Sequence, residues 1–122
     1  EIWCVFGCGG NRDKGKRPLM GEIAEDFCDQ LIITDDNPRN EEGDDIVEHI
    51  LSGIDKPDKV CVIRDRAAAI SHAVSNANAG DVVLVAGKGH ETYQDIAGSR
   101  NIFSDAKQLR LALKERDRKR SN

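Results

Sequence analysis

The residues whose types could best do chemistry form the tetrapeptide Asp36-Asn37-Pro38-Arg39, which follows the apolar run 31–33 after two intervening residues. The tetrapeptide combines a carboxylate, an amide and a guanidinium, and its proline stiffens the loop and disfavours helix at the residue before it. An arginine can pair with a carboxylate through two parallel hydrogen bonds, which gives direction as well as charge. This combination indicates a site for a small zwitterion. The alternative is a helix-entry turn in which Asp36 or Asn37 acts as the cap.

A second group of polar residues, the segment 7–16 (GCGGNRDKGK), follows the first apolar run of the chain. Its glycines let backbone N–H groups approach an anion closely, and Arg12, Lys14 and Lys16 add positive charge. The spacing is not GxGxxG, because Arg12 stands where the third glycine would fall, and it is not a Walker A loop. The segment therefore suits a phosphate or a carboxylate, or else is a tight strand-to-helix turn with solvated charges.

A third group, Gly87 to Glu91 (GKGHE), follows the apolar run 82–85. Its carboxylate, Glu91, could hold the ammonium group of a ligand. His90 is a conceivable base, but a lone histidine is more often a satisfied structural donor, so we assign no catalytic residue. A simple turn is again the alternative.

The elements that must position these loops follow from the alternation of apolar runs with helix-like stretches, which predicts an α/β fold. The runs are apolar nearly throughout, as expected for parallel strands covered on both faces, so we expect a Rossmann-like, mostly parallel twisted sheet flanked by helices. The segment 92–103 predicts a hairpin-like edge around residues 97–100. We expect strands at 2–6, 30–34, 60–63 and 82–85, and helices from about Pro18 to Phe27, over 41–51, between Asp65 and Gly80, and from Ser104 until the chain frays in the charged tail 114–122.

Two of the expected helices carry further predictions. The first should bury one apolar stripe on the sheet, made of Leu19, Met20, Ile23, Ala24 and Phe27. The second gathers acidic residues at its positive dipole end, namely Glu41, Glu42, Asp44 and Asp45, and turns Ile46, Val47, Ile50 and Leu51 inward. Asp65 and Ser104 are the expected N-caps of the last two helices.

Ligands of open parallel sheets bind at the carboxyl ends of the strands, where all three polar loops would lie. The loops would converge on one rim that carries two arginines, an amide and a glutamate: Arg12, Arg39, Asn37 and Glu91. This set is complementary to an amino acid with both ammonium and carboxylate groups.

Composition limits the classes of function. The chain has 122 residues, enough for one domain with a core, and its mean hydropathy of -0.54 is that of a soluble protein. Its apolar runs are of strand length, so no membrane segment is expected. The net charge of -4 gives no overall attraction to nucleic acid, and acidic residues interrupt the basic tail 116–120.

The four cysteines, Cys4, Cys8, Cys28 and Cys61, show no CxxC spacing, so we predict no metal site. We expect free thiols that pack as small hydrophobic groups. Free thiols suit a reducing cytoplasm, and no segment resembles a signal peptide.

The segment 5–20, the tetrapeptide 36–39 and the GKGHE segment followed by Tyr93-Gln94-Asp95 closely resemble the C-terminal domain of the Mur ligase family of peptidoglycan synthesis, in its branch that adds meso-diaminopimelate. The resemblance covers essentially the whole chain. It implies that meso-diaminopimelate is bound by Arg12, Asp36, Asn37, Pro38, Arg39, Gly87 and Glu91. It also implies, more weakly, that Lys14 faces nucleotide phosphates.

The family resemblance further implies a reaction. Family members use ATP and Mg²⁺ to activate the glutamate γ-carboxylate of UDP-N-acetylmuramoyl-L-alanyl-D-glutamate as an acyl phosphate, which the incoming amine attacks. Diaminopimelate differs from lysine by one extra carboxylate, and Arg39 would discriminate between the two amino acids by pairing with it.

The chain also departs from the complete family pattern, because no GKT or GKS sequence occurs in it. The resemblance places the ATP, magnesium and UDP-sugar sites in two preceding domains. We therefore expect residues 1–122 to be the C-terminal domain of a three-domain enzyme, with no ligation and at best weak amino-acid binding by itself. The start within the first strand predicts an exposed apolar sheet face there and a tendency to associate. The alternative is a stand-alone amino-acid-binding module of similar fold.

Overall fold

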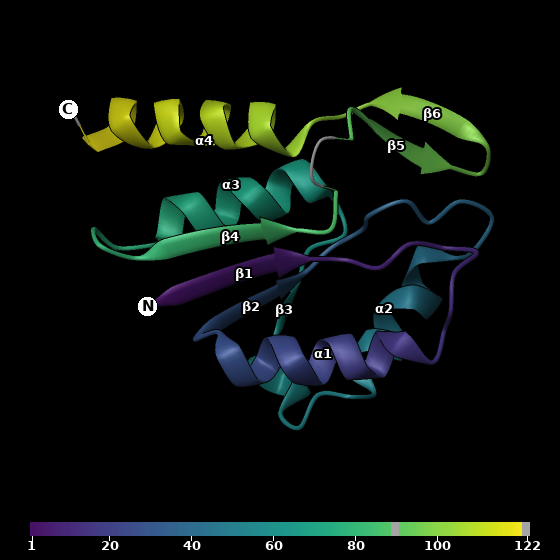
Figure 1. The fold of residues 1–122 in the computed structure, drawn as a ribbon. Helices are drawn as coiled ribbons and strands as arrows, with labels where there is room; N and C mark the ends of the chain where they lie inside the picture. The colour runs from purple at the N-terminus through teal and green to yellow at the C-terminus, as the bar shows by residue number, and fades with distance from the viewer. Residues whose placement is uncertain (89–90, 121–122) are drawn as a thin grey trace.

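The computed structural model describes residues 1–88 and 91–120. At its centre lies a parallel four-stranded sheet in the order β3-β2-β1-β4 (Figure 1). The strands are β1 (Ile2–Phe6), β2 (Gln30–Ile33), β3 (Cys61–Val62) and β4 (Val82–Ala86). The predicted α/β fold with a parallel, Rossmann-like sheet is confirmed.

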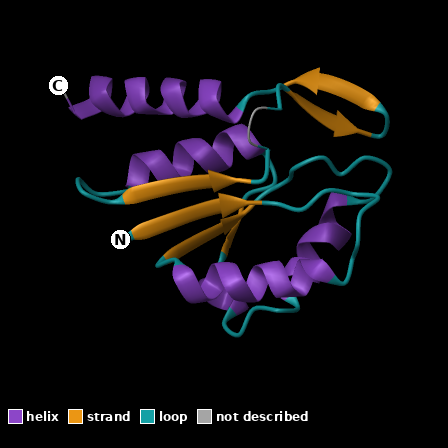
Figure 2. Cartoon of the chain, viewed as in Figure 1, coloured by secondary structure: helices purple, strands orange, loops and turns teal. Residues whose placement is uncertain are grey.

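Helices cover both faces of this sheet (Figure 2). On one side lie α1 (Lys16–Phe27) and α2 (Gly43–Leu51), and on the other lie α3 (Arg66–Asn76) and α4 (Asp105–Arg120). Because successive strand residues point to opposite faces, Cys4 and Phe6 enter the core under α1 and α2, whereas Trp3 and Val5 enter the core under α3. The central strand β1 is thus buried on both faces.

The order of the strands creates a switch point between β1 and β4. The chain passes from β1 through β2 to β3 on one side of β1, and then returns through α3 to place β4 on the other side. At such a point the connections leave the strand ends in opposite directions and open a crevice. Gly7 and Gly87 flank it, and a Cβ atom on Gly87 would lie 3.5 Å from the Gly7 carbonyl oxygen. The φ of +114° at Gly87 favours glycine there.

The predicted helix caps are confirmed. The Asp65 carboxylate accepts a hydrogen bond from the backbone N–H of Ala68 at 3.2 Å, and the Ser104 hydroxyl accepts one from that of Lys107 at 3.3 Å. Each satisfies one of the unpaired N–H groups of a first helical turn. The local sequence therefore fixes where α3 and α4 begin.

The expected hairpin is present but is not an edge of the central sheet. Strands β5 (Tyr93–Ile96) and β6 (Ser99–Ile102) form a separate two-stranded sheet beyond the carboxyl ends of β1 and β4 (Figure 1). Its turn consists of Ala97 and Gly98, with φ of +51° and +82°, which matches the right-handed twist of a tight hairpin.

Several expected boundaries were wrong, among them those of the third strand, the second helix and the last helix. The third strand is only Cys61–Val62, one residue shorter at each end than the expected 60–63, and η1 (Pro57–Lys59) precedes it. The second helix starts at Gly43 rather than at Glu41, whose carboxylate pairs with Arg17 outside the helix. The last helix does not fray at residue 114 but continues to Arg120.

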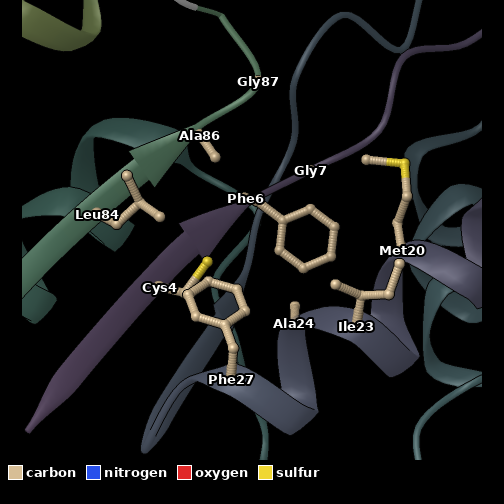
Figure 3. A pocket seen from close by; sticks show the side chains of 10 residues that line it. All are labelled: Cys4, Phe6, Gly7, Met20, Ile23, Ala24, Phe27, Leu84, Ala86 and Gly87. Carbon is tan, nitrogen blue, oxygen red and sulfur yellow. The ribbon is translucent and has the colours of Figure 1, made fainter.

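The expected burial of the α1 stripe was also largely wrong. Of that stripe only Ala24 is buried, while Leu19 and Ile23 are 57% and 64% exposed. The helix instead packs against α2 at Gly21, which contacts Ile50 directly. Three other residues of the stripe, Met20, Ile23 and Phe27, line an open apolar groove beside the sheet together with Cys4, Phe6, Leu84 and Ala86 (Figure 3). The exposed apolar face expected near the first strand is thus present.

Candidate functional site

A buried lysine, Lys88, holds the tetrapeptide 36–39 through its side-chain ammonium. Lys88 is 3% exposed, and its ammonium donates hydrogen bonds to the Asn37 side-chain oxygen at 2.8 Å and to the Tyr93 carbonyl at 2.9 Å. It also lies 2.9 Å from Asp36 Oδ1 as an ion pair. Asn37, expected to face the ligand, is 2% exposed, so its side-chain oxygen is used within the protein.

The hairpin holds the tetrapeptide by main-chain pairing. The Arg39 N–H donates to the Asp95 carbonyl at 3.0 Å, and the Ala97 N–H donates to the Arg39 carbonyl at 2.6 Å. The Asp95 N–H donates to the Asn37 side-chain oxygen at 2.9 Å. The loop after β2 and strand β5 therefore behave as one rigid unit.

The Arg39 guanidinium is fixed at one end and open at the other. Its Nη1 donates to the Gly10 carbonyl at 2.9 Å and approaches the Asn37 carbonyl at 3.4 Å. No described residue accepts a hydrogen bond from its Nε or Nη2, which share the opposite edge. Two parallel N–H groups on one edge are the arrangement that binds a carboxylate bidentately.

The first loop is tied to the tetrapeptide by a second ion pair. Glu41 accepts hydrogen bonds from buried Arg17 at 2.7 Å and from the Asn11 N–H at 2.6 Å. These partners, above all Arg17, lower the pKa of Glu41 from 4.5 to about 2. The Gly10 N–H also donates to the Asn37 carbonyl at 2.7 Å. The two loops thus keep a fixed spacing.

The remaining cations of the first loop lie at its surface. Arg12 is exposed, and its Cγ atom lies 3.5 Å from the position that a Gly9 Cβ atom would occupy. The Arg39 Nη1 atom lies 2.8 Å from the same position. Lys14 lies 3.4 Å from Glu41 with its side chain 65% exposed. Both arginines of the predicted rim are therefore neighbours, with Lys14 at the margin.

The loop after β4 supplies the acidic side of the site. The Glu91 side chain is 37% exposed, and its Oε1 atom lies 4.0 Å from the Lys88 ammonium. Gly87 faces Asp36, whose Oδ2 atom is 3.5 Å from the position of a Cβ atom on that glycine. His90 lies outside the described residues. The three loops are in contact, since Lys88 of this loop holds Asn37 and the Gly10 N–H donates to the Asn37 carbonyl.

Beneath the site, Arg66 fixes the ends of two strands. Its side chain is fully buried and donates to the Asp35 and Ala86 carbonyls, each at 3.0 Å, directly after β2 and at the end of β4. It also forms two hydrogen bonds to Asp105, at 2.7 and 2.8 Å. Arg66 thus joins the two strand ends to the first residue of α4.

Several of these positioning residues were missed in the sequence. Neither Lys88 nor Arg17 was singled out from the sequence. Their burial depends on distant partners, since Lys88 meets Asn37 across 51 residues and Arg17 meets Glu41 across 24 residues. No local signal distinguishes them from solvated charges.

Among residues 1–88 and 91–120, no cluster of three or more His, Cys, Asp or Glu side chains is placed to hold a metal ion. In the same part of the chain, no helix has the length and apolar character needed to cross a membrane. All four cysteines are free thiols, and burial raises the pKa of Cys4 and of Cys8 to about 11.

Comparison with known proteins gives one consistent result. The family described as "Mur ligase, glutamate ligase domain" matches residues 1–89. UDP-N-acetylmuramoyl-L-alanyl-D-glutamate--2,6-diaminopimelate ligase of Xanthomonas campestris pathovar campestris is 59% identical over 113 residues, which is 93% of this chain and 23% of that protein. The ligase of the same name from Neisseria meningitidis serogroup A is 54% identical over 112 residues, covering 92% of this chain and 22% of its own length.

A solved structure of a ligase with that name superposes with a TM-score of 0.91 at 45% identity. The match covers 96% of this chain and 24% of the solved chain. This chain therefore spans about a quarter of the length of the proteins that it matches.

Proposed function

Because this chain belongs to the Mur ligase family, we propose that it is the amino-acid-binding domain of an ATP-dependent ligase that adds meso-diaminopimelate to UDP-N-acetylmuramoyl-L-alanyl-D-glutamate. In this proposal, residues 1–122 are the C-terminal domain of a three-domain enzyme of peptidoglycan precursor synthesis. The names of the similar ligases support the substrate. The observation that carries the proposal is the open Nε–Nη2 edge of Arg39 beside Arg12.

The charges of the site match the charges of the proposed ligand. We assign the open edge of Arg39 to the distal carboxylate of meso-diaminopimelate, the group that lysine lacks. Glu91 is assigned to an ammonium group. Arg12, which lies beside Gly9 and is exposed, is assigned to ligand binding as well. Asp36, Asn37, Pro38 and Gly87 shape the floor of the site, with the Asp36 carboxylate beside Gly87.

The proposed contribution to the reaction is orientation of the amine. A site that holds both ends of the amino acid fixes its nucleophilic nitrogen relative to a carboxyl group activated elsewhere in the enzyme. Such positioning can supply several kcal/mol of the rate enhancement, out of about 7–11 kcal/mol available from proximity in favourable cases. No group of this chain is assigned a covalent or proton-transfer role.

ATP and Mg²⁺ belong to the proposal for the complete enzyme, which would bind them mainly outside residues 1–122. The sequence has no P-loop, and the described residues contain no carboxylate cluster suited to the metal. Lys14, with its side chain 65% exposed at the margin of the site, stays the candidate contact to a nucleotide phosphate. We accordingly expect no ligation by this chain alone. We also propose a cytoplasmic location, which the four free thiols support.

The amino-acid assignment is tested by calorimetric titration of the complete enzyme with meso-diaminopimelate and with L-lysine. The wild-type protein should prefer meso-diaminopimelate by about 2–5 kcal/mol, because binding of lysine leaves the Arg39 guanidinium without its partner. Arg39→Ala should remove most of this preference, whereas Arg110→Ala, at an exposed position of α4, should preserve it. Unchanged discrimination in Arg39→Ala would refute the role of this residue.

The domain assignment is tested by a chimera. This chain replaces the matching segment of the Xanthomonas campestris ligase, 23% of that protein. The chimera should ligate meso-diaminopimelate when supplied with ATP and the UDP-linked dipeptide. A folded chimera that binds the amino acid but never ligates it would favour the alternative, an amino-acid-binding module without ligase activity.

A further inference from the structure

Lys88 stands out because a charged side chain is completely buried at the centre of the three loops. Its side chain has no exposed surface, and oxygens of three different residues surround its ammonium. The ammonium donates hydrogen bonds to the Asn37 side-chain oxygen and the Tyr93 carbonyl, and it lies 2.9 Å from Asp36 Oδ1 as an ion pair. Because the Lys88 side chain has no exposed surface, it acts on a ligand through the groups that it holds.

Those groups belong to all parts of the site. Asn37 is the shared partner, since its side-chain oxygen accepts from Lys88 and from the Asp95 N–H while its carbonyl accepts from the Gly10 N–H at 2.7 Å. The lysine therefore connects the loop after β4 with the tetrapeptide, the hairpin and, through Asn37, the first loop. Arg39 lies two residues after Asn37, and Glu91 lies three residues after Lys88.

Lys88 also balances the charge of Asp36. The Asp36 side chain is 12% exposed, and no described residue donates a hydrogen bond to its Oδ1 atom, so the ion pair with Lys88 is the contact that compensates this oxygen. A buried carboxylate without a counter-charge would draw in a cation or move toward solvent. Either change would alter the side of the site that faces Gly87.

We propose that Lys88 is the positioning residue that sets the spacing between the arginine side and the glutamate side of the amino-acid site. The inference rests on the proposed function. It predicts an effect on the binding of the amino acid and on no other substrate, because among the described residues the ammonium contacts only the tetrapeptide, Tyr93 of β5 and, at 4.0 Å, Glu91.

The test uses the complete natural polypeptide that contains this chain, assayed for ligation with each substrate varied in turn. In Lys88→Met the Michaelis constant for meso-diaminopimelate should rise about tenfold to a hundredfold, the effect of leaving a buried polar group without its partner. The Michaelis constants for ATP and for the UDP-linked dipeptide should stay within about twofold, because Lys88 holds only groups of the amino-acid site.

Two further variants make the test decisive. Lys88→Arg keeps the charge, but its planar fork cannot reproduce the three contacts of a tetrahedral ammonium, so it should raise the same constant by a smaller factor. It replaces the methionine variant in the comparison if that variant does not fold. Lys107→Met removes an exposed lysine of α4 and should match the wild type.

An unchanged Michaelis constant for meso-diaminopimelate in the Lys88 variants would overturn the inference. So would a lower turnover number with all Michaelis constants unchanged, because that pattern reports only a smaller fraction of folded enzyme. If the wild-type enzyme ligates no amino acid, the proposed function itself is refuted and the role of Lys88 with it. If the wild type ligates meso-diaminopimelate, a negative result in the variants refutes the role of Lys88 alone.

Discussion

Replacement of Arg66 by methionine tests how the strand ends beneath the site are held. The Arg66 side chain is fully buried, with hydrogen bonds of 2.7 and 2.8 Å to Asp105 and of 3.0 Å to the carbonyls of Asp35 and Ala86. Methionine has an unbranched apolar chain and no donor. The substitution would leave the Asp105 carboxylate, 7% exposed, and two carbonyl groups without partners.

The expected loss of stability is large. Removal of one partner from a buried ion pair costs about 3–5 kcal/mol, because the remaining charge stays buried without compensation. A domain has a total stability of only about 5–15 kcal/mol. With a urea dependence of about 1.5 kcal/mol per molar, the unfolding midpoint should fall by about 2–3 M. The double variant Arg66→Met/Asp105→Leu removes both charges and should be more stable than Arg66→Met alone.

The assay is urea unfolding followed by the fluorescence of Trp3, the single tryptophan, which is buried at 9% exposure. Arg118→Met is the matched control, since it breaks an Arg–Glu pair with Glu115 whose side chains are 64% and 46% exposed, and no resolvable change is expected. A midpoint shift below about 0.5 M in Arg66→Met would refute the reasoning, given the usual urea dependence. A double variant less stable than Arg66→Met would do the same.

Three further predictions concern pH, loop packing and thiols. Arg17 lowers the pKa of Glu41 from 4.5 to about 2, so the ionised Glu41 contributes stability that is present above pH 4.5 and lost as the pH falls through 2. The urea midpoint of Glu41→Gln should therefore depend less on acid pH than that of the wild type, and an equal dependence would contradict this. Gly10→Ala places a Cβ atom 1.8 Å from the Pro38 carbonyl oxygen, so it should lower both the stability of the domain and its affinity for the amino acid. In the control Gly15→Ala, the nearest contact of the new Cβ atom is the Asp13 side-chain oxygen at 3.2 Å, and calorimetry should detect little change. The pKa of about 11 at Cys4 and Cys8 predicts that a disulfide reagent labels these two thiols slowly in native buffer and fast in urea. Equally fast labelling of all four cysteines in native buffer would argue against this prediction.

What the sequence could predict of the fold depended on local signals. Asp65 and Ser104 satisfy N–H groups three residues away, so the starts of α3 and α4 were readable. The apolar stripe of α1 was also readable, but periodicity says only that a stripe exists. What covers the stripe depends on the neighbouring elements, and among the described residues nothing covers Ile23, which is 64% exposed.

The candidate site shows the same limit. The strand-end rule placed the loops with Arg12, Arg39 and Glu91 on one rim, because any parallel sheet collects its carboxyl ends at one edge. The rule could not tell that the Asn37 side chain would turn inward, since this follows from Lys88 and from the Asp95 N–H, which come from elements 51 and 58 residues away. Contacts between residues so far apart in the chain produce no periodic pattern in the sequence.

The conformation of Arg39 explains why the hairpin belongs to the site although no ligand role is assigned to it. Arg39 has a φ of +53°, a left-handed conformation that costs a non-glycine residue about 1–2 kcal/mol. Its N–H and carbonyl are both paired with the hairpin, at 3.0 Å to Asp95 and 2.6 Å to Ala97, and these bonds offset the cost. Because φ sets the direction in which a side chain leaves the main chain, this pairing points the guanidinium at the Gly10 carbonyl and leaves its other edge open. The proposed preference for a second carboxylate therefore depends on backbone hydrogen bonds from β5 and its turn as well as on the arginine itself.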